Sequence, residues 1–341
     1  MAIREKENDH LPIPNGWHAM CWSHELHTGE VMPMEFCGED LVLFRSRSGE
    51  ARVLDAFCPH MGTHLGYGGR VIGDTVRCPY HAWQFDGATG ECTHIPYCEE
   101  IPDRANLKAW HVRECNNLVY CWYHAEGAEP QWEVPVLEEF NGERSGSTNP
   151  EDWAEPVYWI FDNPAHVQDG HENNLDPAHV YYLHGAQSVP LDAETYKFVY
   201  QDDSPAMSAF CNDKLETPYG PVDGESERVN WNIGLGAIRM RSEFFGFTVF
   251  FSTRPVNEKR SISYVQLTST NNVIDAVGGE IIARFDMEIP KDVEIWTHKV
   301  YRDKPVLCQA DRPLAEYRKW CKQFYCDQNG DDNDATLRNV S

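Results

Sequence analysis

The chain has 341 residues, which is long enough for two domains of ordinary size. Its formal net charge of −25 at pH 7 argues against nucleic acid and anionic membranes as partners, because both are negatively charged. No apolar run reaches the roughly eighteen residues of a membrane-spanning helix. The charged N-terminal segment lacks the apolar stretch of a signal peptide, so we expect a cytoplasmic protein.

Short apolar runs broken by Gly, Pro and Asp extend from about Trp17 to Trp122. Examples are Asp40–Arg45 and Arg52–Phe57, and runs of this kind are typical of strands joined by turns. We therefore predict an all-β domain over residues 1–145, whose N-terminal extension could pack on the next domain. The segment from Asn141 to Pro156, rich in Gly, Ser, Asn, Glu and Pro, is predicted to connect the two domains.

Two metal-ligand motifs lie within this predicted β domain, Cys58-Pro-His60 and Cys78-Pro-Tyr-His81. Each motif supplies one cysteine and one histidine, whereas a zinc finger spaces its cysteines together and its histidines together. A Rieske [2Fe–2S] cluster needs the mixture, because two thiolates hold one iron and two imidazoles hold the other. The spacing therefore predicts a Rieske cluster, with a Cys2His2 zinc site as the alternative.

Other cysteines and aromatic residues in the chain are less informative. The remaining ten cysteines have no ligand spacing, and we expect them to be reduced. Trp83 and Phe85 follow the second motif and could shield a cluster, although ordinary core packing is the alternative.

The pattern changes in the second half of the chain. A segment rich in His, Asp and Asn, from about Asn163 to Gly185, is predicted to be mostly helical. Residues Arg228–Thr270 are rich in β-branched and aromatic residues and are predicted to form an antiparallel sheet. Two more helices are predicted at Pro290–His298 and at Pro313–Phe324, the second with an apolar face.

His179 and His184 are candidates for a second metal site. Their five-residue spacing corresponds to a rotation of about 140° on an ideal helix, so a break near His184 is required, and Gly185 could supply it. Two histidines and one carboxylate on one face of an iron leave the other positions open for dioxygen. Considered without the cluster motif, such residues are more often structural histidines than ligands, and the cluster motif reverses this preference.

The third ligand must come from elsewhere in the chain. Asp292 is favoured, because the predicted helix begins just before it and its first turn could direct a carboxylate inward. Glu294, Asp286 and Asp303 are the alternatives. The other role open to Asp292 is that of a helix N-cap, which aspartate commonly fills.

Together these residues resemble the oxygenase component of Rieske non-haem iron oxygenases, over nearly the whole chain. The likeness is nearest to 3-ketosteroid 9α-hydroxylase oxygenases and related sterol-acting enzymes. Beyond the metal motifs it rests on Pro14–Trp17, Asp40–Phe44, Val53–His60, Asp292–Trp296, Lys304–Leu307, Arg318–Trp320 and Gln323–Tyr325. The implied fold is α+β, with an all-β Rieske domain, a helix-grip catalytic domain over residues 146–326 and a polar tail over 327–341.

The resemblance also implies ligand roles. Cluster ligands would be Cys58, His60, Cys78 and His81, and ligands of a mononuclear Fe(II) would be His179, His184 and Asp292. Ala82 departs from the family, which usually has glycine after the second cluster histidine; this small change is not expected to prevent cluster binding.

Two further residues gain a role from the resemblance. Asp176 matches the acidic residue that bridges His81 of one subunit to His179 of its neighbour, which implies a homotrimer; an N-cap before Pro177 is the alternative. Asn173 lies where the family often has an amide near the iron, and a surface asparagine is the alternative.

The implied activity is that of a monooxygenase that uses O2 and electrons from NAD(P)H, delivered by a separate flavin and iron–sulfur reductase or by a ferredoxin. The substrate would be hydrophobic, steroid-like or polycyclic, and Trp231, Phe244, Phe247 and Phe250 are candidates to contact it, with sheet core as their alternative. Desaturation, demethylation and cis-dihydroxylation use the same metal centres. A Rieske electron carrier and a structural zinc protein are the alternatives from other classes.

Overall fold

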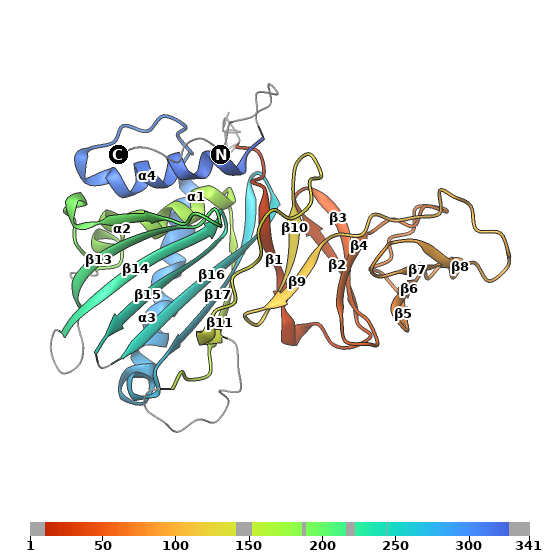
Figure 1. The fold of residues 1–341 in the computed structure, drawn as a ribbon, viewed down its shortest axis with the longest axis horizontal. Coiled ribbons are helices and arrows are strands. Elements are labelled where there is room, and N and C mark those ends of the chain that lie inside the picture. Colours follow the sequence, from red (N-terminus) through yellow and green to blue (C-terminus); the bar gives the residue numbers. More distant parts are fainter. Residues whose placement is uncertain (1–10, 141–151, 186–188, 216–221, 244, 327–341) are drawn as a thin grey trace, which may run out of the picture.

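The computed structural model describes residues 11–140, 152–185, 189–215, 222–243 and 245–326. The molecule is elongated, with small β-sheets toward one end and a large sheet flanked by helices at the other (Figure 1). The predicted domain boundary near residue 145 and the predicted tail at 327–341 lie outside the described residues. Among the described residues, no helix combines the length and apolarity needed to cross a membrane.

The N-terminal part consists of antiparallel strands, which confirms the all-β prediction. Three small sheets are formed, with the strand orders β1-β10-β9, β2-β3-β4 and β5-β6-β7-β8. The strands are β1 (Gly16–Trp22), β2 (Val31–Phe36), β3 (Glu39–Arg45), β4 (Ala51–Asp55), β5 (Arg70–Ile72), β6 (Thr75–Arg77), β7 (Gln84–Asp86), β8 (Cys92–His94), β9 (Val112–Cys115) and β10 (Leu118–Tyr123).

The C-terminal part is built on a seven-stranded antiparallel sheet with the order β11-β17-β16-β15-β14-β13-β12. Its strands are β11 (Val157–Asn163), β12 (Lys197–Tyr200), β13 (Met207–Leu215), β14 (Val222–Asn232), β15 (Leu235–Ser242), β16 (Gly246–Asn257) and β17 (Arg260–Ser269). The predicted sheet over 228–270 is confirmed, but the observed sheet also includes strands from earlier in the chain.

Helices flank this sheet (Figure 1). The α-helices are α1 (Val167–His171), α2 (Pro177–Tyr182), α3 (Asn271–His298) and α4 (Arg312–Cys321). Single turns of 3-10 helix are η1 (Ser23–Glu25), η2 (Glu138–Phe140), η3 (Glu172–Leu175), η4 (Ala193–Thr195), η5 (Gln309–Asp311) and η6 (Lys322–Phe324). The helical segment between Asn163 and Gly185 and the last predicted helix are confirmed.

The predicted start of one helix is wrong. Helix α3 begins at Asn271 and not at Pro290, so Asp292 lies inside the helix and is neither at its start nor its N-cap. The first half of α3 contains Gly278 and Gly279, which disfavour helix locally. Packing outweighs this preference, because the partly buried side chains of Ile281 and Phe285 pack against the sheet.

The two parts of the chain share a core. Trp17 and Trp122 of the N-terminal part pack in one cluster with Trp231, Phe250 and Tyr264 of the large sheet. The Tyr264 hydroxyl donates to the Met20 carbonyl at 2.7 Å. The N-terminal segment also lies on the C-terminal part, where the main-chain N–H of Asn15 donates to the main-chain carbonyl of Phe324 at 2.8 Å.

Candidate metal centres and active site

The four predicted cluster ligands lie on two similar loops, one between β4 and β5 and one between β6 and β7. In each loop the cysteine carbonyl accepts a hydrogen bond from the amide N–H four residues later, that of Gly62 (2.9 Å) or Ala82 (3.2 Å). The Nδ1 atoms of His60 and His81 lie 3.2 Å apart. The loops therefore present both imidazoles to one point, as a two-histidine iron site requires.

The sulfur side of this site is buried and polarised. Cys58 and Cys78 are both buried in the same hydrophobic cluster as Phe85. Burial raises the pKa of the Cys58 thiol to about 11, while hydrogen bonds from the main-chain N–H groups of His60 and Met61 oppose that rise. These N–H groups directed at sulfur favour the thiolate, the form that binds iron.

Trp83 covers the histidine side of the site. Its ring stacks on that of His60, with centroids 4.6 Å apart and planes 9° apart. Its indole N–H donates to the Tyr97 hydroxyl at 2.7 Å. The stacking and this hydrogen bond together fix the position of the ring over the site. The expected shielding by Trp83 thus has a structural basis, and Phe85 packs in the same buried cluster as Trp83 and the two cysteines.

Ala82 has a left-handed backbone with a φ of 60°, and Gly62 has a φ of 72° at the matching position of the other loop. Left-handed backbone costs an L-residue about 1 kcal/mol relative to glycine. We expect Ala82→Gly to raise the free energy of unfolding of the cluster-loaded protein by up to about 1 kcal/mol, and Gly62→Ala to lower it by a similar amount. Urea unfolding of both variants checks this, and an unstable Ala82→Gly variant would contradict it.

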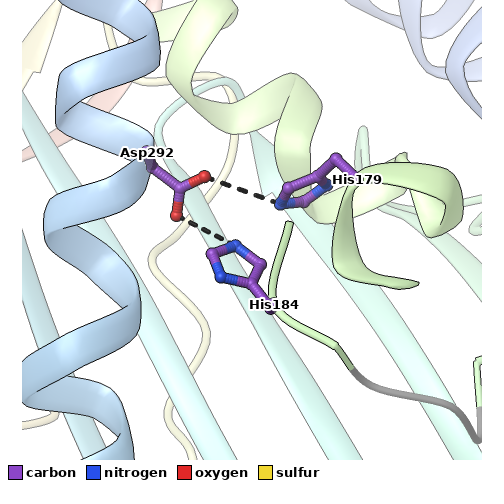
Figure 2. A group of neighbouring side chains, drawn as sticks. All are labelled: His179, His184 and Asp292. Carbon is purple, nitrogen blue, oxygen red and sulfur yellow. Dashed lines mark ion pairs between the residues drawn. The ribbon is translucent and has the colours of Figure 1, made fainter. Parts of the chain in front are cut away.

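A second group of ligand-type residues forms where α2 ends beside α3 (Figure 2). Ligand atoms of His179, His184 and Asp292 all lie within 4.8 Å of one another. Asp292 Oδ2 is 3.2 Å from His184 Nε2, and Asp292 Oδ1 is 3.7 Å from His179 Nε2. Helix α2 ends at Tyr182 and Gly185 has a φ of 67°, so the chain breaks at the expected place and turns His184 toward the same point.

Hydrogen bonds on the far side of each ring define which nitrogen faces this point. Nδ1 of His179 lies 2.8 Å from the Asp176 carbonyl oxygen, and Nδ1 of His184 lies 3.0 Å from Glu288 Oε2. Both oxygens can only accept, so each neutral ring carries its proton on Nδ1. The Nε2 electron pairs then face the Asp292 carboxylate, an arrangement that is stable only with a cation between them.

The spacing fits a metal ion as that cation. Nitrogen and oxygen ligands about 2.1 Å from a metal and roughly at right angles to one another lie about 3 Å apart. Two imidazoles and one carboxylate on one side are the donors of a non-haem Fe(II) site with open positions. The three residues therefore fit the implied iron. When no metal is bound, a proton can be shared between the Asp292 carboxylate and the imidazoles.

The pKa shifts of the two histidines reflect this geometry. Burial lowers the pKa of His179, and the more distant Asp292 and Asp176 only partly oppose it. Burial acts on His184 in the same direction, but its hydrogen bonds to Asp292 and Glu288 outweigh burial and raise its pKa.

Asn173 and Asp292 are in direct contact. The Asn173 side-chain amide donates to Asp292 Oδ1 at 3.0 Å, which orients the carboxylate. Asp292 is 8% exposed, whereas Glu294 pairs with the exposed His298 on the outer side of α3. The other two alternatives also point elsewhere: Asp286 accepts from the Trp159 indole, and Asp303 is exposed.

Asp176 is the N-cap of α2, and its carboxylate accepts from the His179 main-chain N–H at 3.1 Å. The alternative role for this residue is therefore present in the structure. It leaves the bridging role possible, because only Oδ1 takes part in the cap. The His179 ring bonds the Asp176 carbonyl and not its carboxylate.

Sequence reasoning missed Glu288, which lies one turn before Asp292 on α3 and binds both His184 and Lys291. Removing it leaves the His184 ring free to rotate. We expect Glu288→Ala to weaken Fe(II) binding to the apoprotein about 10- to 100-fold without loss of the cluster. Iron titration followed by metal analysis measures this, and Glu294→Ala on the same helix is the control; equal affinities in the two variants would contradict the role.

A cavity of about 270 Å³ lies between α3 and the large sheet and includes the His179, His184 and Asp292 group in its wall. Its walls are mostly apolar. The aromatic residues in them are Phe161, Phe251, Phe285 and Trp296.

Trp231 and Phe250, two of the predicted substrate-contacting residues, do not line this cavity. Both lie in the core on the opposite face of the sheet, because neighbouring residues of a strand point to opposite faces and Phe251 takes the cavity face. Phe247 packs beneath α3 but is not part of the cavity wall. Phe244 lies outside the described residues.

A cluster site of two cysteines and two histidines, joined to a sheet domain with two histidines and an aspartate beside a cavity, defines the class of Rieske non-haem iron oxygenases. Residues 16–111 match the family model of the Rieske [2Fe-2S] domain, and residues 121–325 match that of the 3-ketosteroid 9alpha-hydroxylase C-terminal domain. The chain belongs to the Rieske oxygenase family with this type of catalytic domain, and it is an oxidoreductase.

Named relatives act on steroids. Cholesterol 7-desaturase nvd 1 of Ciona intestinalis is 33% identical over 96% of this chain and 72% of its own length. The oxygenase component of 3-ketosteroid-9-alpha-monooxygenase of Rhodococcus rhodochrous is 26% identical over 95% of this chain and 86% of its own length.

Solved structures share the fold. The structure of Pseudomonas putida CBB5 NdmA with caffeine has a TM-score of 0.75 and 19% identity, over 90% of this chain and 89% of the other. The Rieske family implies a [2Fe–2S] cluster, a mononuclear iron and O2 in this chain as well.

Proposed function

We propose that the protein is a terminal oxygenase that inserts one oxygen atom of O2 into a hydrophobic, steroid-like substrate. The observation that carries this proposal is the group of His179, His184 and Asp292 in the wall of a mostly apolar cavity. Bound Fe(II) would supply the open positions at which dioxygen is reduced. Two electrons and two protons are consumed for each turnover, and the second oxygen atom leaves as water.

The chain's own residues have separable tasks in this reaction. Asn173 and Glu288 orient the ligands Asp292 and His184. The aromatic walls exclude water and hold an apolar molecule beside the ligands. A bulky, rigid hydrophobic substrate suits such walls, and steroids are the substrates that the names of the relatives state.

Electrons would come from NAD(P)H through a reductase or a ferredoxin to the cluster loops. These loops lie near the sheet β5–β8, at the opposite end of the molecule from α2 (Figure 1). Electron transfer within one chain would therefore be slow, which supports transfer to the iron of a neighbour in a homotrimer. Exposed aromatic side chains near the cluster, such as Tyr67 and Tyr80, suit contact with a protein partner.

Desaturation is the second candidate reaction, because the relatives include cholesterol 7-desaturases. Both reactions need the same centres and differ in where the oxygen atoms go. Hydroxylation places one atom in the product, whereas desaturation removes two hydrogens and sends both oxygen atoms to water.

Incubation with NADH, a reductase, 18O2 and a panel of sterols, ketosteroids and polycyclic aromatics tests the proposal. The expected result is a product that carries one 18O atom. An unlabelled alkene product would support desaturation instead. A cluster that is reduced and reoxidised without any product, in protein that carries the mononuclear iron, would contradict an oxygenase and favour an electron carrier.

A further inference from the structure

The sheet side of the cavity changes from apolar to polar along its strands. Val265 of β17 and Phe251 of β16 are register partners in the cavity wall. One step along on the same face, Ser263 pairs with Thr253, and both also line the cavity. Asn163 of the neighbouring strand β11 extends this polar end.

The polar end is a continuous hydrogen-bonded chain. The Asn163 amide donates to Ser263 Oγ at 2.7 Å, Ser263 Oγ lies 3.1 Å from Thr253 Oγ1, and His171 Nε2 lies 2.9 Å from Thr253 Oγ1. Burial lowers the pKa of His171 to about 3, so the ring is neutral near pH 7. The polar end consequently carries no formal charge.

The charged residues in the cavity wall lie elsewhere. Arg284, Glu288 and Asp292 all belong to α3, and Glu288 and Asp292 contact the histidine ligands. A carboxylate or an ammonium group at the polar end would be desolvated without an opposite charge, which is strongly unfavourable. Chemistry therefore restricts this end to an uncharged polar group.

One atom at this end is an unused acceptor. Asn163 is 2% exposed, and its Oδ1 is buried without a hydrogen-bond partner. An unpaired buried acceptor costs about 1–3 kcal/mol, which a donor on a ligand would recover. A hydroxyl can donate to Asn163 and accept from Ser263 together, whereas a ketone can only accept.

We propose that Asn163, Ser263 and Thr253, supported by His171, bind an uncharged hydroxyl group on an otherwise apolar substrate. This rests on the proposed function only in calling the ligand a substrate. It narrows the substrate class to alcohols of rigid hydrocarbons, and it makes Ser263 a specificity-determining residue.

Three probes on one skeleton test the inference: 5α-androstan-3β-ol, 5α-androstan-3-one and 5α-androstane. We expect the metal-loaded protein to bind the alcohol about tenfold more tightly than the hydrocarbon, with the ketone between them. In Ser263→Ala the alcohol and the hydrocarbon should bind with nearly equal dissociation constants. Equilibrium dialysis without reductant measures binding apart from turnover.

The control is Ser269→Ala, which removes a buried hydroxyl of the same strand that donates to the Gly246 carbonyl outside the cavity. It should keep the preference for the alcohol. If Ser263→Ala does not fold, the isosteric Thr253→Val replaces it, with the same expectation. Equal binding of the three probes by the unaltered protein, or tighter binding of the ketone, would overturn the inference. An alcohol preference in a protein without oxygenase activity would instead contradict only the proposed function.

Discussion

Replacing Asp292 with alanine is expected to abolish substrate oxidation and to remove the mononuclear iron while the cluster stays bound. Asp292 is the one carboxylate in the described ligand group, and it contacts both histidines. Without it two neutral imidazoles remain, and they bind Fe(II) weakly because the site has lost one of its three ligands and its negative charge. Iron analysis should fall from about three to about two atoms per chain, with the Rieske absorption and EPR signal unchanged.

Asp286→Ala is the matched control for this change. Asp286 lies on the same helix, is exposed and accepts a hydrogen bond from Trp159, away from the ligand group. It should retain both metal centres and activity. If Asp292→Ala kept its full iron content and its activity, the third ligand would have to be another residue.

The second large effect is expected from Asp176→Asn. Asparagine is as good an N-cap as aspartate, so α2 should begin at the same residue and His179 should keep its position. The substitution removes only the negative charge and one acceptor. Both metals should stay bound, while single-turnover electron transfer from the reduced cluster falls about 100-fold.

Asp192→Asn controls for the cap itself, because the Asp192 carboxylate caps η4 by accepting from the Glu194 main-chain N–H and belongs neither to the ligand group nor to the cavity wall. The rate of electron transfer from the reduced cluster should be unchanged in the Asp192→Asn variant. Undiminished transfer in Asp176→Asn would show that Asp176 serves only as a cap. A loss of iron in that variant would instead assign it to positioning His179.

The cluster motifs could be recognised from the sequence because each is local. Cys58 and His60 are two residues apart, so a single tight loop places both ligands, and the structure adds only how the two loops face one another. The break after α2 was predictable for the same reason, since the spacing of His179 and His184 does not fit one helix face.

Features that depend on packing could not be predicted in this way. Helix α3 extends over two glycines and Pro290 because its side chains pack against the sheet, and this puts Glu288 one turn from Asp292. The sequence did not identify the aromatic residues that line the cavity, because the register of the sheet decides which residues of β16 face it. A shift of one residue exchanges Phe250 and Phe251 between the core and the cavity.

The sequence by itself predicted the chemistry of the protein: two sets of candidate metal ligands, their types and the family to which the chain belongs. Only the tertiary structure decided that Asp292 joins His179 and His184, that Glu288 holds His184, and which face of the sheet meets a substrate. The reason is physical. Ligand spacing within a loop follows from covalent geometry, whereas contacts between distant segments follow from the burial of apolar surface, which no short motif records.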